Sequence, residues 1–461
     1  MFEKEIYIQR RKQLKKSLQS GVVLLLGNGE APVNYSGNDY SFRQDSSFIY
    51  YVGLNMPNLV YVLDIDQNKE YLLGEELSID DIIWMGNLPS LKDRASGVGI
   101  ETVIPLAQLP TLISGTRKIH YLKPYRYRNL LFLSELLNKK PEEVNNDFSL
   151  ELTKAIINMR LIKSPEELKE LEDAGKTGYL MHYIAMQMCH PGIREQDIVG
   201  TIEGLAISEG PRVSFPTILS MNGQTLHNHD HSGKLKRGRL MLCDAGAENH
   251  NLYASDFTRT SAVGGKYSQK QKDIYNIVLK ALNDSIAMVR PGITYQSVHR
   301  NAYKILFEGL RDLGLTKGDT EEALNVGAPA LFMPHGLGHA MGLDVHDMEN
   351  LGETFVGYDD ETHRDTRFGY RSLRFGKRLE PGHVLTVEPG IYFIPQLIKK
   401  WEAEKINRDF IHFDKLESYY SFGGIRLEDD IVITPNGCRL VYENRLPITI
   451  EEIEQTVVGG G

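Results

Sequence analysis

Four acidic residues and one histidine constrain this chain more than any other feature of its sequence. Asp244, Asp256, His339, Glu388 and Glu428 each stand in a short motif, and each acid is embedded in apolar, strand-like sequence. A buried carboxylate costs free energy unless a cation or hydrogen bonds compensate its charge. A fold that buries these segments must therefore supply such compensation. The motifs cover residues 243–246, 254–259, 335–339, 386–390 and 424–429.

Convergence of these five side chains would create a strongly acidic site that is suited to metal ions. Two divalent cations would offset the charge, and ligands rich in oxygen and poor in nitrogen suit Mn, Mg, Co or Zn. Two neighbouring cations hold and deprotonate a bridging water and polarise a carbonyl. A nearby carboxylate shuttles the proton, and histidines donate hydrogen bonds to the oxyanion. His227, His335 and His346 are available for that role. The set indicates hydrolysis of an amide bond.

The length of 461 residues predicts more than one domain. We expect an N-terminal α/β domain over residues 1–155 and a second, α+β domain over 156–461. Ser164 and Pro165 between them have the pattern of a helix N-cap followed by proline at the first helical position. Short apolar runs predict N-terminal strands at 21–27, 48–52 and 59–63.

The second domain shows two helix pairs, each followed by acid-bearing strands. The first hairpin would place Asp244 and Asp256 opposite each other across a turn near 249–251. The second would pair the strand that ends at Glu388 with the strand that carries Glu428. This order is a weak internal repeat and suggests two halves with the metals between them. The helices are predicted at about 165–189, 194–208, 267–289 and 295–313.

The motifs resemble those of the metallopeptidases with the pita-bread fold, and most closely the proline-specific branch of aminopeptidase P and prolidase. The stretches that carry the resemblance are 332–339 with 342–347, and 385–392. Residues 42–48 resemble the N-terminal domain of the same enzymes. The resemblance implies an aminopeptidase P/prolidase-type α/β domain before a pita-bread catalytic domain. It also implies a metal-dependent exopeptidase that cleaves the Xaa-Pro bond of dipeptides or short peptides through a metal-bridging hydroxide.

The resemblance further implies roles for the four acids and the one histidine of the metal site. Asp244 would chelate one ion, while Asp256 and Glu428 would bridge both. His339 and Glu388 would complete the second ion's site, with Glu388 also acting as the proton shuttle. The cofactor is expected to be two divalent ions per subunit, Mn first, with Co or Zn accepted by the same ligands.

Four further residues receive substrate-binding roles by the same resemblance. His227 and His346 would contact the substrate carbonyl and the oxyanion, and His335 would line the same pocket. Arg426 would support the site or meet the substrate's carboxylate. The three histidines are counted with Glu388 as catalytic.

One spacing departs from the family pattern. The interval from Asp244 to Asp256 is one residue longer than usual, and we place the extra residue in the turn at 248–252. On a strand it would invert the alternation, so that one aspartate would miss the metals.

Substrate length and three function classes stay open. The long, charged segment at 391–424, with Trp401, resembles prolidases, and residues 370–374 offer cations for a dipeptide's carboxylate, which slightly favours dipeptides over longer peptides. A metal-free, creatinase-like hydrolase or a binding scaffold would lose the ligands that are present here. A methionine aminopeptidase would not need the large N-terminal domain.

Composition limits the partners. A net charge of -9 argues against nucleic acid, and no apolar run is long enough to span a membrane. The charged N-terminal sequence shows no signal-peptide core, and three cysteines without metal-type spacing favour a reducing cytoplasm. By resemblance we expect a homodimer or a dimer of dimers. His229 and His231 are expected to be solvated, and Trp84 to be packed.

Overall fold

The computed structural model describes residues 1–115 and 117–458. The chain divides into two compact units, Met1–Arg160 and Leu161–Gly461. The helix α8 (Leu150–Leu161) runs through the expected domain boundary at 155 and ends at the beginning of the second unit. The expected order, an α/β part followed by an α+β part, is the order found.

The first unit is built around a five-stranded mixed sheet in the order β4-β3-β2-β1-β5. Val22, Leu24, Val60 and Val62 are buried in the core on this sheet. The strands predicted at 21–27 and 59–63 are confirmed as β1 and β2. The strands are β1 (Val22–Leu26), β2 (Val60–Asp64), β3 (Lys69–Leu73), β4 (Val103–Ile104) and β5 (Ile119–Tyr121). The helices before α8 are α1 (Lys4–Lys16), α2 (Ser46–Val52), α3 (Ile79–Met85), α4 (Leu91–Gly97), α5 (Leu109–Leu112), α6 (Tyr127–Leu136) and α7 (Pro141–Asn146).

The strand predicted at 48–52 is wrong, because this segment forms the helix α2. Its β-branched and aromatic residues favour strands, but the ends of the segment decide otherwise. The Asp45 carboxylate accepts a hydrogen bond from the Phe48 backbone N–H, and Gly53 ends the helix in a left-handed conformation with φ 74°. Every residue of the helix is buried, so no polar face marks its period in the sequence.

The second unit begins with the helix α9 (Pro165–Gln187), which starts as predicted. The Ser164 side chain accepts from the Glu167 backbone N–H, and Pro165 occupies the first turn. The other three predicted helices are present, with ends shifted by one to two residues: α10 (Glu195–Glu209), α11 (Gln269–Met288) and α12 (Tyr295–Asp312). The remaining helices are α13 (Thr320–Val326), α14 (Glu353–Gly357), α15 (Pro395–Ala403), α16 (Phe413–Leu416) and α17 (Ile450–Val458).

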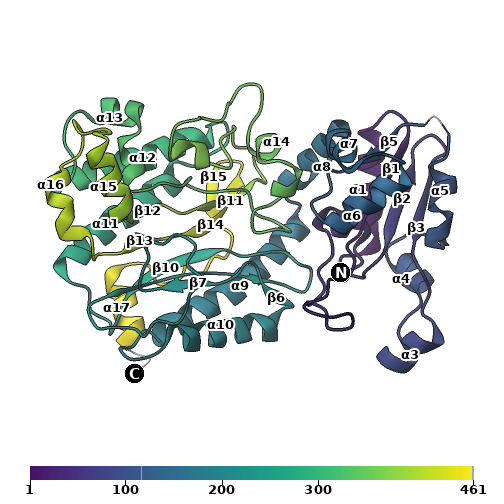
Figure 1. The fold of residues 1–461 in the computed structure, drawn as a ribbon, viewed down its shortest axis with the longest axis horizontal. Helices are drawn as coiled ribbons and strands as arrows, with labels where there is room; N and C mark the ends of the chain where they lie inside the picture. Colours follow the sequence, from purple (N-terminus) through teal and green to yellow (C-terminus); the bar gives the residue numbers. More distant parts are fainter. Residues whose placement is uncertain (116, 459–461) are drawn as a thin grey trace. The chain divides into compact units, whose positions relative to one another are not determined.

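Short antiparallel sheets lie between these helices. In Figure 1, α9 and α10 lie below the strands, while α12 and α13 lie above them. One sheet has the order β10-β8-β7, a second β11-β14-β15, and two pairs join β12 to β13 and β6 to β9. The strands are β6 (Arg212–Val213), β7 (Ile218–Ser220), β8 (Leu240–Ala245), β9 (Ala247–Glu248), β10 (Phe257–Ala262), β11 (Val384–Val387), β12 (Gly390–Tyr392), β13 (Gly424–Arg426), β14 (Asp429–Thr434) and β15 (Gly437–Leu440).

A buried ion pair connects the start of the second unit to the loop that carries His346. The Lys163 Nζ lies 2.9 Å from the Asp347 Oδ2, and both side chains are 1% exposed. The Lys163 backbone N–H also donates to the Gly382 carbonyl at 2.9 Å. The pair therefore holds the segment before α9 against the loop that follows His339.

We expect Lys163→Met to lower the free energy of unfolding by about 3–5 kcal/mol, because it removes the charge that pairs with the buried Asp347 carboxylate. The double variant Lys163→Met/Asp347→Leu should recover most of that loss, since neither charge then remains. Urea denaturation of the two variants beside the parent protein measures both values. Equal destabilisation by the single and the double variant would contradict this account.

Candidate metal centre

All nine residues that the sequence predicts for the site line one cavity of the second unit, with a volume of about 590 Å³. Its walls come from segments more than two hundred residues apart in the chain, from Phe215 to Glu428. Apolar residues such as Phe215, Ile218 and Leu226 form part of the wall. The nine are Asp244, Asp256, His339, Glu388, Glu428, His227, His335, His346 and Arg426.

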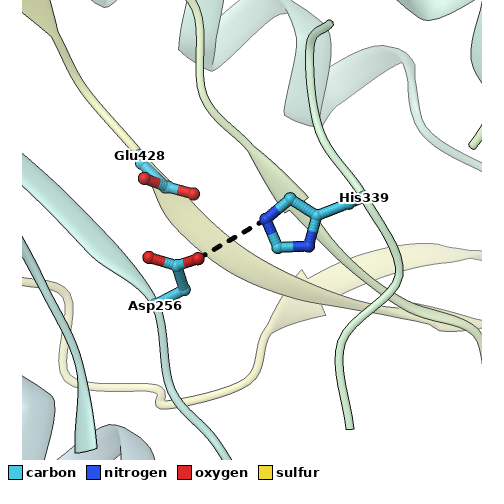
Figure 2. Close-up of side chains that lie close together, drawn as sticks. All are labelled: Asp256, His339 and Glu428. Carbon is cyan, nitrogen blue, oxygen red and sulfur yellow. Dashed lines mark ion pairs between the residues drawn. The ribbon is translucent and has the colours of Figure 1, made fainter. Parts of the chain in front are cut away.

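Three of these residues form a compact group of possible metal ligands. One ligand atom each from Asp256, His339 and Glu428 lies within 4.8 Å of the others, and all three residues are buried. Figure 2 shows the three side chains converging, with the Asp256 Oδ2 3.4 Å from the His339 Nε2. Asp256 directly precedes β10, and Glu428 stands between β13 and β14. Two carboxylates and an imidazole at this spacing suit a divalent cation.

The tautomer of His339 is set by its surroundings. Its Nδ1 lies 3.1 Å from the Ala340 carbonyl oxygen, which can only accept a hydrogen bond, so Nδ1 carries the proton. The lone pair of Nε2 is thereby directed to the carboxylates. The Thr386 hydroxyl accepts a hydrogen bond from the His339 backbone N–H at 3.1 Å, which holds the His339 backbone in place. A fixed tautomer of this kind is typical of metal-binding histidines.

Asp244 and Glu388 lie at the edge of this group. The Glu388 Oε1 is 3.8 Å from the His339 Nε2. The Asp244 Oδ2 instead pairs with the Arg426 Nη2 at 2.5 Å. Both acids line the same cavity as the three-residue group. The five predicted ligands thus share one site, but only three of them lie within mutual reach of one small ion.

The first acid hairpin keeps an unbroken register through the region of unusual spacing. Ala245 pairs with Phe257 and Asp244 with Thr258, and Glu248 bridges to Ala254 in the same register. The additional residue therefore lies in the turn, where Leu252 adopts a positive φ of 67°. Asp244 and Asp256 are diagonal neighbours on one face of the hairpin, rather than directly opposed as the sequence suggested.

The second acid pair follows one register across two short strand pairs. Val387 pairs with Asp429, and Gly390 pairs with Arg426. The same antiparallel register places Glu388 opposite Glu428. The Glu428 backbone N–H donates to the Thr258 carbonyl at 3.1 Å, which joins this ladder to the first hairpin. The connection between the two strands is long and contains α15 and α16, so the pair is not a local hairpin.

The acids are destabilised by one another and by burial. Burial raises the pKa of Asp256, and the charges of Glu428 and Asp244 raise it further. Burial likewise raises the pKa of Glu428, with added repulsion from Glu388 and Asp244. Burial raises the pKa of Glu388 to about 7, with the Arg426 charge opposing the shift. Such a cluster binds a cation favourably because the cation removes the repulsion.

Two buried carboxylate oxygens support the same conclusion. Within the described part of the chain, the Asp244 Oδ1 and the Asp256 Oδ1 accept no hydrogen bond. A buried, unsatisfied acceptor costs free energy, and a metal ion would compensate both atoms. The donor set and these atoms therefore fit a divalent cation.

Arg426 is fully engaged beside the metal cluster. Its Nη2 pairs with Asp244, its Nη1 donates to the Tyr392 hydroxyl at 2.8 Å, and its Nε donates to the Thr258 hydroxyl at 3.2 Å. The Thr258 hydroxyl in turn donates to the Glu428 Oε2 at 2.6 Å. This network orients two of the predicted ligand carboxylates.

The predicted histidines differ in their surroundings. The His335 Nε2 lies 2.9 Å from the Tyr392 hydroxyl and its Nδ1 2.7 Å from the Gly336 carbonyl, while burial lowers its pKa to about 3 and keeps it neutral. The His346 Nδ1 lies 3.1 Å from the Glu349 Oε1. His227 is exposed at the cavity wall.

The structure adds residues to which the sequence assigned no role. Tyr392 stands inside one of the recognised motifs, but only its contacts with Arg426 and His335 indicate a role. Glu349, three residues after His346, carries no motif signal at all. His229 is exposed, as expected, but it also lines the cavity.

Comparison with known proteins places the chain in a family. Residues 169–435 match Metallopeptidase family M24, and residues 7–120 match the aminopeptidase P, N-terminal domain. The chain therefore belongs to metallopeptidase family M24. Within residues 1–115 and 117–458, no helix is both long and apolar enough to cross a membrane.

Similar proteins match over almost the whole chain. The Xaa-Pro dipeptidase of Homo sapiens is 31% identical, over 96% of this chain and 90% of that protein. The Xaa-Pro aminopeptidase of Escherichia coli is 32% identical, over 93% of this chain and 92% of that protein. The structure of Zn-substituted E. coli aminopeptidase P in complex with product superimposes with a TM-score of 0.82 at 29% identity, covering 100% of this chain and 99% of that one. The expected pita-bread fold is confirmed.

We expect Asp256→Asn to weaken Mn²⁺ binding by at least about tenfold, because it removes a charged ligand from the group. The variant should also raise the melting temperature of the metal-free protein, since one repelling carboxylate is gone. Isothermal titration with Mn²⁺ and calorimetry of the metal-free protein measure the two effects. The control is Glu361→Gln, because Glu361 is an exposed acid that does not line the cavity. Unchanged affinity would show that Asp256 is no ligand.

The raised pKa of Glu388 predicts a pH-dependent stability. Since its folded pKa of about 7 lies above its ordinary value of 4.5, the folded state holds the proton more tightly than the unfolded state. The resulting stabilisation is complete below about pH 4.5 and is lost as the pH rises through about 7. Melting temperatures of the metal-free protein between pH 5 and 8 should therefore fall, and Glu388→Gln should reduce the slope. An equal slope in the variant would contradict the assignment.

Proposed function

We propose that this protein is a metal-dependent exopeptidase that hydrolyses the Xaa-Pro bond at the N-terminus of dipeptides or short peptides. The observation that carries the proposal is the convergence of nine predicted site residues on one cavity around the Asp256, His339 and Glu428 group. The similar proteins named Xaa-Pro dipeptidase and Xaa-Pro aminopeptidase support the bond type, since each aligns with more than nine-tenths of this chain.

The metal assignment follows from the donor set. Asp244, Asp256, His339, Glu388 and Glu428 would hold two divalent ions, with Asp256 and Glu428 shared between them. Mn²⁺ is our first choice, and Co²⁺ or Zn²⁺ suits the same ligands. When bound, the ions supply an activated water and polarise the substrate carbonyl. Among the described residues the Asp244 Oδ1 accepts no hydrogen bond, so this oxygen could bind an ion while Oδ2 stays paired with Arg426.

The protein's own groups would move protons and orient the substrate. Glu388, whose Oε1 lies 3.8 Å from the His339 Nε2, would accept a proton beside the metal group and return it to the leaving amine. With both ring nitrogens protonated, His346 would donate from Nδ1 to the Glu349 carboxylate and from Nε2 to the substrate carbonyl. His227 and His335 would complete that wall of the cavity. Arg426 would act through Asp244 and Tyr392, because each of its three nitrogens already has a partner.

Trp401 does not line the cavity. Its side chain is 5% exposed and packs edge-to-face on Phe368 with ring centroids 5.9 Å apart. The cavity wall instead contains Ser372 and Arg374. Arg374, from the segment expected to offer cations, faces the site and is a candidate partner for a substrate carboxylate.

Self-association is proposed from an apolar surface on the first unit. The helix α3 (Ile79–Met85) has no buried residue, and Trp84 is 87% exposed, so the expected packing of Trp84 is wrong. Ile79, Ile83 and Met85 are also exposed on this helix. Contiguous exposed apolar side chains are typical of association surfaces. We propose a homodimer or a dimer of dimers that covers them.

A reducing cytoplasm is proposed from the cysteines. Cys189, Cys243 and Cys438 are free thiols in the described chain, and the first two are buried. Burial raises the pKa of Cys189 to about 12, so this thiol is unreactive at neutral pH.

The test is product release from Ala-Pro, Ala-Pro-Ala and a longer Xaa-Pro peptide by protein that has been stripped with chelator and reloaded with Mn²⁺. We expect turnover only after reloading, because the bound ions would supply the activated water and polarise the substrate carbonyl. Met-Ala-Ser and creatine are the comparison substrates. Turnover of Met-Ala-Ser alone would favour a methionine aminopeptidase, and full activity after stripping would favour a metal-free hydrolase. Silence on every Xaa-Pro peptide with metal bound would refute the proposal.

A further inference from the structure

A second cavity adjoins the site in the same unit. Its volume is also about 590 Å³, and it shares Ser372 and Arg374 with the wall of the first cavity. The shared residues stand one and three positions after Arg371, which lines only the second cavity. The remaining lining residues are Glu353, Arg364, Asp365 and Thr366. A peptide that extends beyond the metal group therefore has an adjoining, strongly charged space to enter.

The carboxylates of this second cavity are already paired. The Glu353 Oε2 lies 2.6 Å from the Arg364 Nη2, and its Oε1 lies 3.0 Å from the Arg374 Nη1. Asp365 pairs with Arg367 through both of its oxygens. Neither acid is therefore left as an isolated negative charge that would repel an anionic ligand.

Arg374 is committed in the same way. Besides Glu353, its Nη1 contacts the Glu349 Oε1 at 2.5 Å. The same Glu349 oxygen lies 3.1 Å from the His346 Nδ1. Arg374 is thus tied to two acids, one of which also holds a histidine of the site. A substrate carboxylate at Arg374 would have to compete with both.

Arg371 is the exception. Among the described residues, no carboxylate forms an ion pair with its guanidinium, which lies 5.9 Å from the centre of the Phe368 ring. Its backbone, in contrast, is held on both sides. Its N–H donates to the Arg367 carbonyl at 2.9 Å, and its carbonyl accepts from the Arg364 Nε at 2.8 Å. The cavity therefore presents one uncommitted guanidinium from a fixed backbone.

We propose that the second cavity is a subsite for the C-terminal carboxylate of peptides longer than a dipeptide, with Arg371 as its anchor. The inference rests on the proposed function and specifies its substrates as Xaa-Pro-Yaa peptides with one or more residues after proline. Each extended residue adds about 3.3 Å, so a residue after proline carries the carboxylate away from the metal group. A guanidinium binds a carboxylate through two parallel hydrogen bonds, which gives the subsite its preference for a free C-terminus.

The experiment compares Ala-Pro, Ala-Pro-Ala, Ala-Pro-Ala-Ala and the C-terminal amides of the two longer peptides on the Mn²⁺-loaded full-length protein. The variant is Arg371→Gln. The control is Arg378→Gln, at an exposed arginine of the same segment that pairs with Glu361 at 3.3 Å and lines neither cavity. KM and kcat are measured for each pair of protein and substrate.

For the parent protein, amidation should raise KM by about three- to tenfold for at least one of the longer peptides, as expected for loss of a partly exposed charge-assisted contact. In Arg371→Gln, the KM for the longer peptide with a free C-terminal carboxylate should rise to the KM of the corresponding amide, and kcat should not change. The amides and Ala-Pro should be unaffected by this variant, and Arg378→Gln should resemble the parent protein throughout.

If amidation of the peptides does not change KM for the parent protein, the subsite is overturned. It is also overturned if Arg371→Gln raises KM equally for the free peptides and for their amides. An effect of Arg378→Gln equal to that of Arg371→Gln would overturn it too, because general surface charge would then explain both. Absence of turnover of every Xaa-Pro peptide by the parent protein is a different result. It would overturn the proposed function and the subsite together.

Discussion

Mutual repulsion among buried carboxylates is the constraint on which the second unit depends. Asp244, Asp256, Glu388 and Glu428 line one cavity, and burial raises the pKa of three of them. Protein groups offset only part of this cost. Arg426 pairs with Asp244, and the Thr258 hydroxyl donates to Glu428. The unsatisfied oxygens of Asp244 and Asp256 mark what the protein leaves for a cation to supply.

The same network extends outward from the acids to the substrate-facing wall. Arg426 reaches His335 through the Tyr392 hydroxyl, so one guanidinium orients both a predicted ligand and a histidine. On another wall, Glu349 joins His346 to Arg374, and Glu353 joins Arg374 to Arg364. Alternating acids and arginines keep this wall close to neutral. The charge that remains available to a substrate is therefore confined to a few positions. This favours binding of a substrate charge at a defined position over general attraction of charged substrates.

Particular segments show where sequence reasoning succeeded and where it did not. The helix α9 was predictable because Ser164, Pro165 and Glu167 form a local capping pattern. Residues 48–52 were misassigned, because a helix buried on all sides has no polar face to reveal its period. Trp84 was expected to pack, since large aromatic residues are commonly buried, yet its helix exposes its apolar side chains. The local sequence does not distinguish an apolar helix that packs against the rest of the protein from one whose side chains stay exposed.

By itself, the sequence predicted which residues would line one cavity and that their charges would need compensation, because acids within apolar strand segments cannot be buried without it. It also determined that Asp244 and Asp256 would share a face, once the additional residue was assigned to the turn. Only the tertiary structure decided that Asp256, His339 and Glu428 form the tight group while Asp244 turns to Arg426. It alone decided that Glu349 pairs with Arg374, while no carboxylate of the described residues pairs with Arg371. These outcomes depend on packing between segments remote in the chain, for which local periodicity holds no information.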